Sequence, residues 1–225
     1  VIKTLIKNRN DLTVIHACDL DAAFPSAVFK FLFSDNVKLV FDVFDWFTDT
    51  LHRQNKLILF CFRVMERFSI YKSDEVIICE NERIHQITYK LNKKELVLPN
   101  IPYFSEINFL FNDEKYFFEN NKIVFSYVGG LVCERFLEEL LIITEQGLVN
   151  LLIAGYGDCN LEKKCEQLSV LPNVKFFGKV DYKTGLNIMF NSDVIYAMYC
   201  KSNPNHIYAA PNKFYEAMML GKPIL

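Results

Sequence analysis

Residues 123–131 read Ile123-Val124-Phe125-Ser126-Tyr127-Val128-Gly129-Gly130-Leu131, an apolar run that ends in two glycines. A short run rich in β-branched and aromatic residues predicts a buried strand. Glycines at its end let the backbone turn sharply and come close to a ligand. Because a helical pattern follows from Glu134, this stretch predicts one strand–turn–helix unit of an α/β fold.

The same unit recurs along the whole chain. We expect strands at residues 12–17, 38–43, 75–79, 96–98, 123–128, 149–154, 174–177 and 194–198. Between them we expect helices at residues 21–33, 57–71, 82–91, 134–144, 161–168 and 184–190, and a last helix opened by Pro211. Short strands that alternate with helices are typical of parallel sheets covered on both faces.

The alternation is interrupted once. Pro99-Asn100-Ile101-Pro102 is rich in turn residues, and a polar segment with scattered aromatics follows it up to about residue 121. Such a break indicates a domain boundary, which we place near residue 112. The sequence therefore predicts two Rossmann-like domains, residues 1–112 and 113–225.

The composition narrows the class of protein. The chain has 225 residues, of which 51% are hydrophobic, and a net charge of −2, so charge alone gives no support to nucleic-acid binding. Its seven cysteines form no C-x-x-C pair and its four histidines have no zinc spacing, which favours free thiols in a reducing compartment and no metal site. We find no signal peptide and no membrane-spanning run, and we expect a cytoplasmic protein.

Two further stretches carry chemistry. Ala154-Gly155-Tyr156-Gly157-Asp158 repeats the glycine turn after the next strand. Neither turn has the full G-x-G-x-x-G fingerprint or the P-loop lysine, which argues against an NAD-binding oxidoreductase. Both lie where open α/β sheets bind ligands, at the carboxyl ends of strands. The last stretch, residues 210–225, predicts a helix that ends at Gly221 and holds the carboxylate of Glu216.

In this order and spacing, residues 122–225 resemble the nucleotide-sugar-binding half of the retaining GT-B glycosyltransferases of family four. The resemblance also rests on residues 173–180 and 192–194. Residues 14–19, 41–45 and 97–102 resemble the acceptor-side half more loosely. The resemblance to these glycosyltransferases implies two Rossmann-like domains that face a cleft, in a chain truncated at both termini. The implied reaction transfers a sugar from a nucleoside-diphosphate donor to an acceptor hydroxyl with retention, in polysaccharide or glycoconjugate synthesis.

The resemblance also implies roles for single residues. Glu216 matches the glutamate that accepts hydrogen bonds from the donor ribose, and Tyr208 stands where the family has its first glutamate. The donor-binding residues implied are Gly129, Gly130, Gly155, Gly157, Lys179, Val180, Tyr208, Pro211, Asn212 and Glu216. The catalytic residues implied are Asp45, Arg135 and Lys213. On the acceptor side, we expect His16 and Asp19, which lie at a strand end, to face the cleft. A strand-end histidine whose hydrogen bonds are satisfied within the fold is the open alternative for His16.

The partners follow from the same resemblance. We expect a nucleotide sugar and a saccharide or lipid-linked acceptor, with no cofactor, no metal and no nucleic acid. Peripheral contact with the inner face of a membrane is a further expectation, since such acceptors are often lipid-linked. Two alternatives stay open: an inactive, truncated remnant that only binds the donor, and a GT-B-like sugar-nucleotide epimerase.

Overall fold

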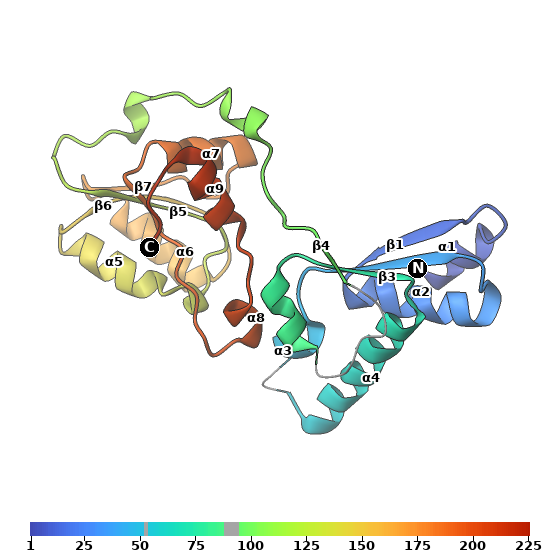
Figure 1. Ribbon diagram of the computed structural model, residues 1–225. Helices are drawn as coiled ribbons and strands as arrows, with labels where there is room; N and C mark the ends of the chain where they lie inside the picture. The colour runs from blue at the N-terminus through green and yellow to red at the C-terminus, as the bar shows by residue number, and fades with distance from the viewer. Residues whose placement is uncertain (52–53, 88–94) are drawn as a thin grey trace. The chain divides into compact units, whose positions relative to one another are not determined.

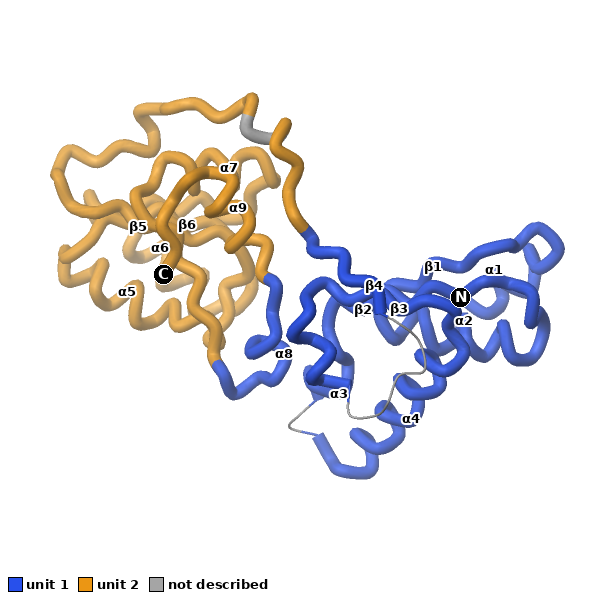
Figure 2. Tube along the Cα trace, in the orientation of Figure 1, with its two compact units in different colours: residues 1–100, 201–210 blue, residues 101–200, 211–225 orange. Residues whose placement is uncertain are grey.

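The computed structural model describes residues 1–51, 54–87 and 95–225. Their contacts divide the chain into two compact units (Figure 2). Unit 1 contains residues 1–100 and 201–210, and unit 2 contains residues 101–200 and 211–225. The sequence predicts a single boundary near residue 112, whereas the contacts divide the chain at residue 100 and return a later segment to unit 1.

The side chain of Asn205 fixes this returning segment. Its Oδ1 accepts a hydrogen bond from the Trp46 main-chain N–H at 3.1 Å, and its Nδ2 donates to the Trp46 carbonyl at 2.9 Å. Asn205 is 3% exposed, so both bonds lie within the packed interior of unit 1. A paired amide of this kind is hard to recognise in a sequence because its partner lies 159 positions away.

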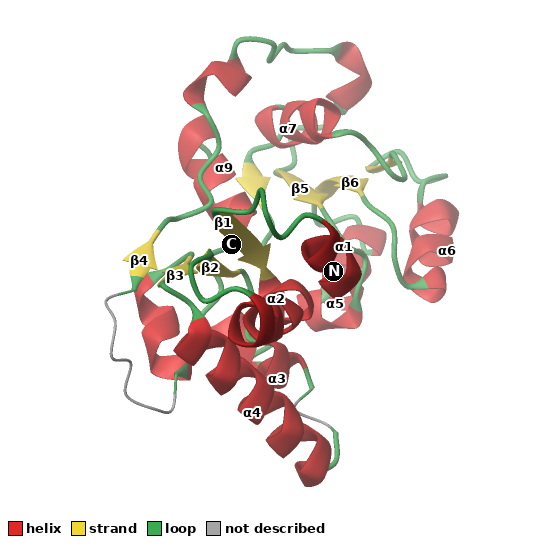
Figure 3. Cartoon of the chain, turned by 90° about the vertical axis from the view of Figure 1, so that its right-hand side faces the viewer, coloured by secondary structure: helices red, strands yellow, loops and turns green. Residues whose placement is uncertain are grey.

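Unit 1 is built on a four-stranded parallel sheet with strand order β1-β2-β3-β4 (Figure 3). The strands are β1 (Val14–Cys18), β2 (Lys38–Val43), β3 (Glu75–Ile78) and β4 (Leu96–Val97). The helices are α1 (Ile2–Lys7), α2 (Asp19–Phe33), α3 (Phe47–Thr50), α4 (Lys56–Lys72) and α8 (Pro204–Ile207), and a 3-10 helix covers Asn81–Gln86.

One face of this sheet forms the core of unit 1. Ile15, Ala17, Leu39 and Phe41 alternate along β1 and β2 and pack with residues of α2 and α4. Figures 1 and 3 show these two helices beside the sheet. Alternation means that the intervening residues point to the opposite face. On β1 these residues are exposed, and Val14 is 55% exposed.

Unit 2 has a second four-stranded parallel sheet with strand order β7-β6-β5-β8. The strands are β5 (Val124–Val128), β6 (Asn150–Ala154), β7 (Val174–Phe176) and β8 (Val194–Ile195). The α-helices are α5 (Leu137–Glu145), α6 (Cys159–Leu168), α7 (Tyr182–Phe190) and α9 (Asn212–Leu220), and three 3-10 helices cover Phe104–Ile107, Glu114–Tyr116 and Cys133–Arg135.

Helices cover both faces of the unit 2 sheet. Every residue of β6 is buried. Leu151 and Ile153 pack with residues of α5 and α6, whereas Leu152 and Ala154 pack with Ile188 of α7 on the other side. Figure 3 shows α7 on one side of β5 and β6 and α5 on the other. This layering brings the ends of β5, β6 and β7 together at one edge.

The elements largely follow the sequence expectations, with local differences. The helix expected at residues 82–91 is a 3-10 helix over Asn81–Gln86, and residues 88–91 lie outside the described residues. The helix α5 begins at Leu137 because Phe136 takes a left-handed conformation, with φ of 54°. Pro211 is the N-cap of α9 and not its first residue, and Gly221 ends the helix in a left-handed conformation as predicted.

Within the described part of the chain, no helix has the length and apolar character needed to cross a bilayer.

Candidate functional site

The two glycine turns of unit 2 support each other. The Gly129 N–H donates to the Ala154 carbonyl at 3.0 Å, and the Gly155 N–H donates to the Gly178 carbonyl at 2.8 Å. A Cβ at Gly155 would lie 1.9 Å from the Gly129 carbonyl oxygen, which no side chain tolerates. Gly155 therefore lets the end of β6 pack directly on the turn after β5, and its role is to position Gly129.

Gly129 in turn makes room for a cation. The Lys213 Nζ lies 4.9 Å from the centroid of the Tyr127 ring, and a Cβ at Gly129 would lie 2.7 Å from the same Nζ. An ammonium group over an aromatic face is favourable, but it keeps only part of its hydration. The structure thus holds the charge of Lys213 at the bare backbone of the turn.

A second cation lies beside it. Arg135 ends the 3-10 helix after the turn, and its guanidinium carbon lies 3.7 Å from the centroid of the Tyr199 ring. Its Nη1 is buried and has no hydrogen-bond partner among the described residues. A buried donor without a partner is rare in proteins and indicates a missing acceptor.

The two cations affect one another. Burial, and next the positive charge of Arg135, lower the pKa of Lys213 to about 8, although Glu216 acts in the opposite direction. Keeping two neighbouring cations in a desolvated position costs free energy in the absence of an anion. The pair is therefore suited to bind a group with more than one negative charge.

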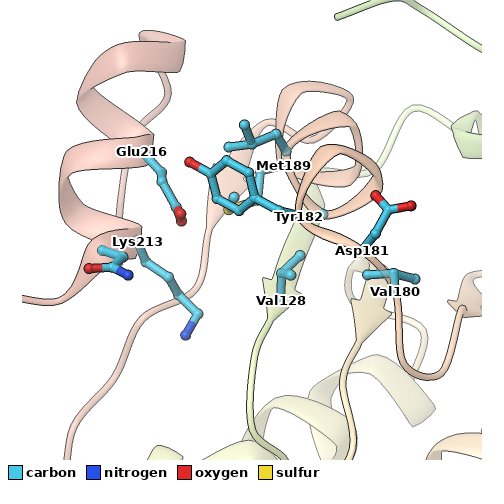
Figure 4. A pocket seen from close by; sticks show the side chains of 10 residues that line it. Val128, Val180, Asp181, Tyr182, Met189, Lys213 and Glu216 are labelled. Atoms are coloured by element: carbon cyan, nitrogen blue, oxygen red, sulfur yellow. The ribbon is translucent and has the colours of Figure 1, made fainter. Parts of the chain in front are cut away.

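Glu216 lies one turn after Lys213 on α9 and is 7% exposed. Both side chains line a cavity of about 250 Å³ (Figure 4). The other lining residues are Val128, Val180, Asp181, Tyr182, Gly185, Leu186, Met189 and Asn212. A buried carboxylate that faces a cavity can accept two hydrogen bonds from a ligand. The cavity has an acidic and a basic side chain on α9 and mostly apolar side chains across from them.

Unit 2 brings several of the expected site residues together. The expected donor-binding residues Val180, Asn212 and Glu216 line the cavity with the expected catalytic residue Lys213, which Gly129 contacts. Pro211 caps the helix that carries three of them, and Gly130 follows in the same turn, where its carbonyl accepts a hydrogen bond from the Tyr127 hydroxyl.

Other expected donor residues lie apart from the cavity lining. Gly157 packs against Leu131, and its N–H donates to the Glu162 carboxylate. The Lys179 Nζ lies over the ring of Tyr156, 4.7 Å from its centroid. Tyr208 follows α8 in the segment that belongs to unit 1.

The expected catalytic and acceptor-side residues of unit 1 lie near the ends of β1 and β2. The Asp45 carboxylate is 58% exposed and accepts a hydrogen bond from the buried Arg83 guanidinium at 2.8 Å. The Asp19 carboxylate accepts one from the Phe44 N–H at 3.1 Å, and burial raises the pKa of Asp19. His16 Nε2 lies 2.9 Å from an oxygen of Asp42.

Several site residues escaped the sequence analysis. Tyr127 and Tyr199 carry the two cations, and burial raises the pKa of both phenols, so they stay neutral. Asp181 and Tyr182 follow Val180 directly. Asp181 is the N-cap of α7 and its carboxylate accepts a hydrogen bond from the Thr184 N–H, and Tyr182 is the first residue of the helix. Tyr127 lies in the strand that ends in the glycine turn. This position is the feature of the sequence that could have identified it as a site residue.

The comparison with solved structures identifies the fold. A sucrose-phosphate synthase from Thermosynechococcus elongatus is similar over 99% of this chain, with a TM-score of 0.73 and 13% identity. Anabaena HepE in complex with UDP and glucose is similar over 99%, with a TM-score of 0.72 and 15% identity. The chain has the GT-B fold.

A third similar structure is a variant of S. aureus TarM with Fondaparinux, alpha-GlcNAc-glycerol and UDP, with a TM-score of 0.57 and 16% identity over 99% of this chain. The chain spans 58%, 61% and 43% of the lengths of these three proteins, in the order given. The sequence matches no protein-family profile and no curated protein.

Proposed function

We propose that unit 2 binds the nucleoside diphosphate of a sugar donor, and that the chain is the donor-binding and acceptor-side part of a glycosyltransferase. The observation that carries this proposal is the pair of Lys213 and Arg135, two crowded cations at a glycine turn, next to the buried carboxylate of Glu216. Similar folds in which UDP is bound, those of HepE and TarM, support it.

The diphosphate is assigned to the two cations. The unpaired Arg135 Nη1 supplies a donor, and the first N–H groups of α9, around Asn212, supply the positive end of a helix dipole. During transfer, negative charge grows on the departing diphosphate. Fixed cations that meet this charge stabilise the transition state without a metal ion. Arg135 and Lys213 are therefore the catalytic residues that we propose in unit 2.

The ribose is assigned to Glu216. A carboxylate can accept from both hydroxyls of a vicinal diol, and Glu216 faces the cavity from the helix that carries Lys213. The apolar side chains of Val180 and Met189 across the cavity suit the flat faces of the nucleoside.

Unit 1 is assigned to the acceptor. We propose that Asp45, His16 and Asp19 serve the acceptor side and that transfer proceeds with retention of configuration to a saccharide or lipid-linked hydroxyl. The anomeric proton signal of the product tests retention: a product with the anomeric configuration of the donor is expected, and an inverted product would contradict it.

Replacing Glu216 by alanine is expected to weaken UDP binding by about 10- to 100-fold, because hydrogen bonds to a charged group contribute about 1.5–3 kcal/mol. Wild-type protein should bind 2′-deoxy-UDP about tenfold more weakly than UDP, whereas Glu216→Ala should bind the two alike. Calorimetry measures both. The exposed Glu138 on α5 provides the control, since Glu138→Ala should leave both affinities unchanged. If Glu216→Ala weakened the binding of UDP and of 2′-deoxy-UDP by the same factor, Glu216 would have no role in recognising the ribose 2′-hydroxyl.

Contact with an anionic membrane surface is also proposed, through α4. Leu57, Phe60, Val64 and Tyr71 recur at helical spacing on this helix and are 50–70% exposed. The helix also carries Lys56, Arg63, Arg67 and Lys72, while its one acid, Glu66, is buried and accepts hydrogen bonds from Thr48. An apolar stripe between cations is suited to lie at a lipid interface with negative headgroups.

Flotation with vesicles tests this surface. Phosphatidylglycerol vesicles should carry the protein, and the double variant Leu57→Ser with Phe60→Ser should lose at least tenfold in bound fraction. Val170 of unit 2 is 83% exposed, and Val170→Ser should float like the wild type. Equal flotation of the double variant would contradict the assignment to α4.

A further inference from the structure

We propose that His16, Cys18 and Asp42 bind a divalent transition ion of the zinc type at the carboxyl edge of the unit 1 sheet. His16 and Cys18 are alternate residues of β1 and share its exposed face. The parallel register pairs Cys18 with Asp42 of β2. One nitrogen, one sulfur and one carboxylate oxygen thereby lie within 4.8 Å of one another.

The spacing suits a tetrahedral ion after small side-chain rotations. Zinc bond lengths of about 2.0–2.3 Å place neighbouring ligand atoms about 3.3–3.8 Å apart. His16 Nε2 and the Asp42 oxygen are 2.9 Å apart and already point at each other. An ion would take the place of the proton that this pair shares.

The donor set also suits the charge and the softness of such an ion. A neutral imidazole, a thiolate and a carboxylate carry two negative charges, which a divalent cation balances. Thiolate and imidazole select zinc or its neighbours in the transition series over magnesium or calcium. Three protein ligands leave a fourth position for water or another oxygen.

The surroundings favour a cation as well. Asp19 and Asp21 follow Cys18 closely in the chain, and Asp42 is paired with it in the sheet. These carboxylates place negative charge around the proposed site.

The sequence predicts no metal site, because it has no C-x-x-C pair and no histidines at zinc spacing. His16 and Asp42 are 26 positions apart. Only the strand register brings them together. The inference does not depend on the proposed donor site, since all three ligands belong to unit 1 and the donor cavity belongs to unit 2.

Cobalt titration of the chelator-treated full chain tests the site. Wild-type protein should develop the thiolate-to-cobalt charge-transfer band at one equivalent and lose it when zinc is added. Cys18→Ser should abolish the band, and Asp42→Asn should weaken cobalt binding at least tenfold. Cys61 is an exposed thiol on α4, and Cys61→Ser should keep the full band.

Circular dichroism and UDP affinity report on folding in the same variants. Both should be unchanged in Cys18→Ser, so that loss of the band reports the missing ligand. A band that persists in Cys18→Ser would overturn the proposal, and so would the absence of a band in the wild type. Loss of UDP binding with a normal cobalt band would contradict the proposed function and leave the metal site in place.

Discussion

Replacing Lys213 by methionine is expected to stabilise the protein and, in the same variant, to weaken the UDP binding that we propose. The folded structure lowers the pKa of Lys213 from 10.5 to about 8, so the charged side chain opposes folding at neutral pH. Methionine keeps the contact with the Tyr127 ring without the charge. We expect a gain of about 1–3 kcal/mol in the free energy of unfolding at pH 7, after allowance for the partial exposure of the side chain. UDP affinity should fall at least tenfold, because the diphosphate loses a buried partner.

The pH dependence of wild-type protein follows from the same shift. Between pH 8 and 10.5 the unfolded chain holds a proton on this lysine that the folded chain has released, so the free energy of unfolding rises with pH. Bound diphosphate requires the charged form, so UDP affinity should fall by up to tenfold per pH unit above about pH 8. Both dependences should be absent in Lys213→Met.

Lys163, an exposed residue of α6, provides the matched control. Lys163→Met should change neither stability nor UDP affinity beyond about 0.5 kcal/mol. A Lys213→Met protein that is less stable than the wild type would show that the ammonium is well compensated before any ligand binds. That result would remove the electrostatic argument for an anion site.

Replacing Gly155 by alanine is expected to destabilise unit 2 by more than about 4 kcal/mol. The added Cβ would lie 1.9 Å from the Gly129 carbonyl oxygen, a backbone atom that cannot rotate away, and the φ of +156° is itself unfavourable for other residues. The turn after β5 would have to move, and the position of Lys213 depends on that turn. Chemical denaturation followed by circular dichroism measures the loss.

Substitutions of two other glycines distinguish the effect of the steric clash at Gly155 from the effect of its backbone conformation. Gly130 has open space around its Cβ position and Gly178 has open space with a φ of +60°. We expect Gly130→Ala to be nearly neutral for folding and Gly178→Ala to cost about 1 kcal/mol. If Gly155→Ala cost no more than Gly178→Ala, the close packing of the two glycine turns would be disproved.

The strands and helices were predictable because each strand of the core is a short apolar run. Lys38–Val43, for example, is predictable to its full length, since Asp35-Asn36 come shortly before it and Asp45 comes shortly after it. The return of residues 201–210 to unit 1 was not predictable, because it depends on Asn205 pairing with a backbone group that lies far away in the sequence. Glycine turns could be located from the sequence, but the support of one turn by the other could not.

For the candidate site, the charged residues could be named from the sequence, but the aromatic rings that contact them could not. Glu216 and Lys213 share a helix, so three positions of sequence place them on one face. Arg135 was expected near them, but the aromatic rings of Tyr127 and Tyr199 that hold the two cations appear only in three dimensions. The same is true of His16, Cys18 and Asp42, which the strand register brings together.

The central claim is that UDP binds at the glycine turn and the first half of α9. Titration of ¹⁵N-labelled protein with UDP tests it by the movement of assigned amide signals. The account predicts the largest shifts at Gly129, Gly130, Lys213 and Glu216, with saturation at one equivalent. Shifts confined to unit 1, or a spectrum that UDP leaves unchanged, would contradict it.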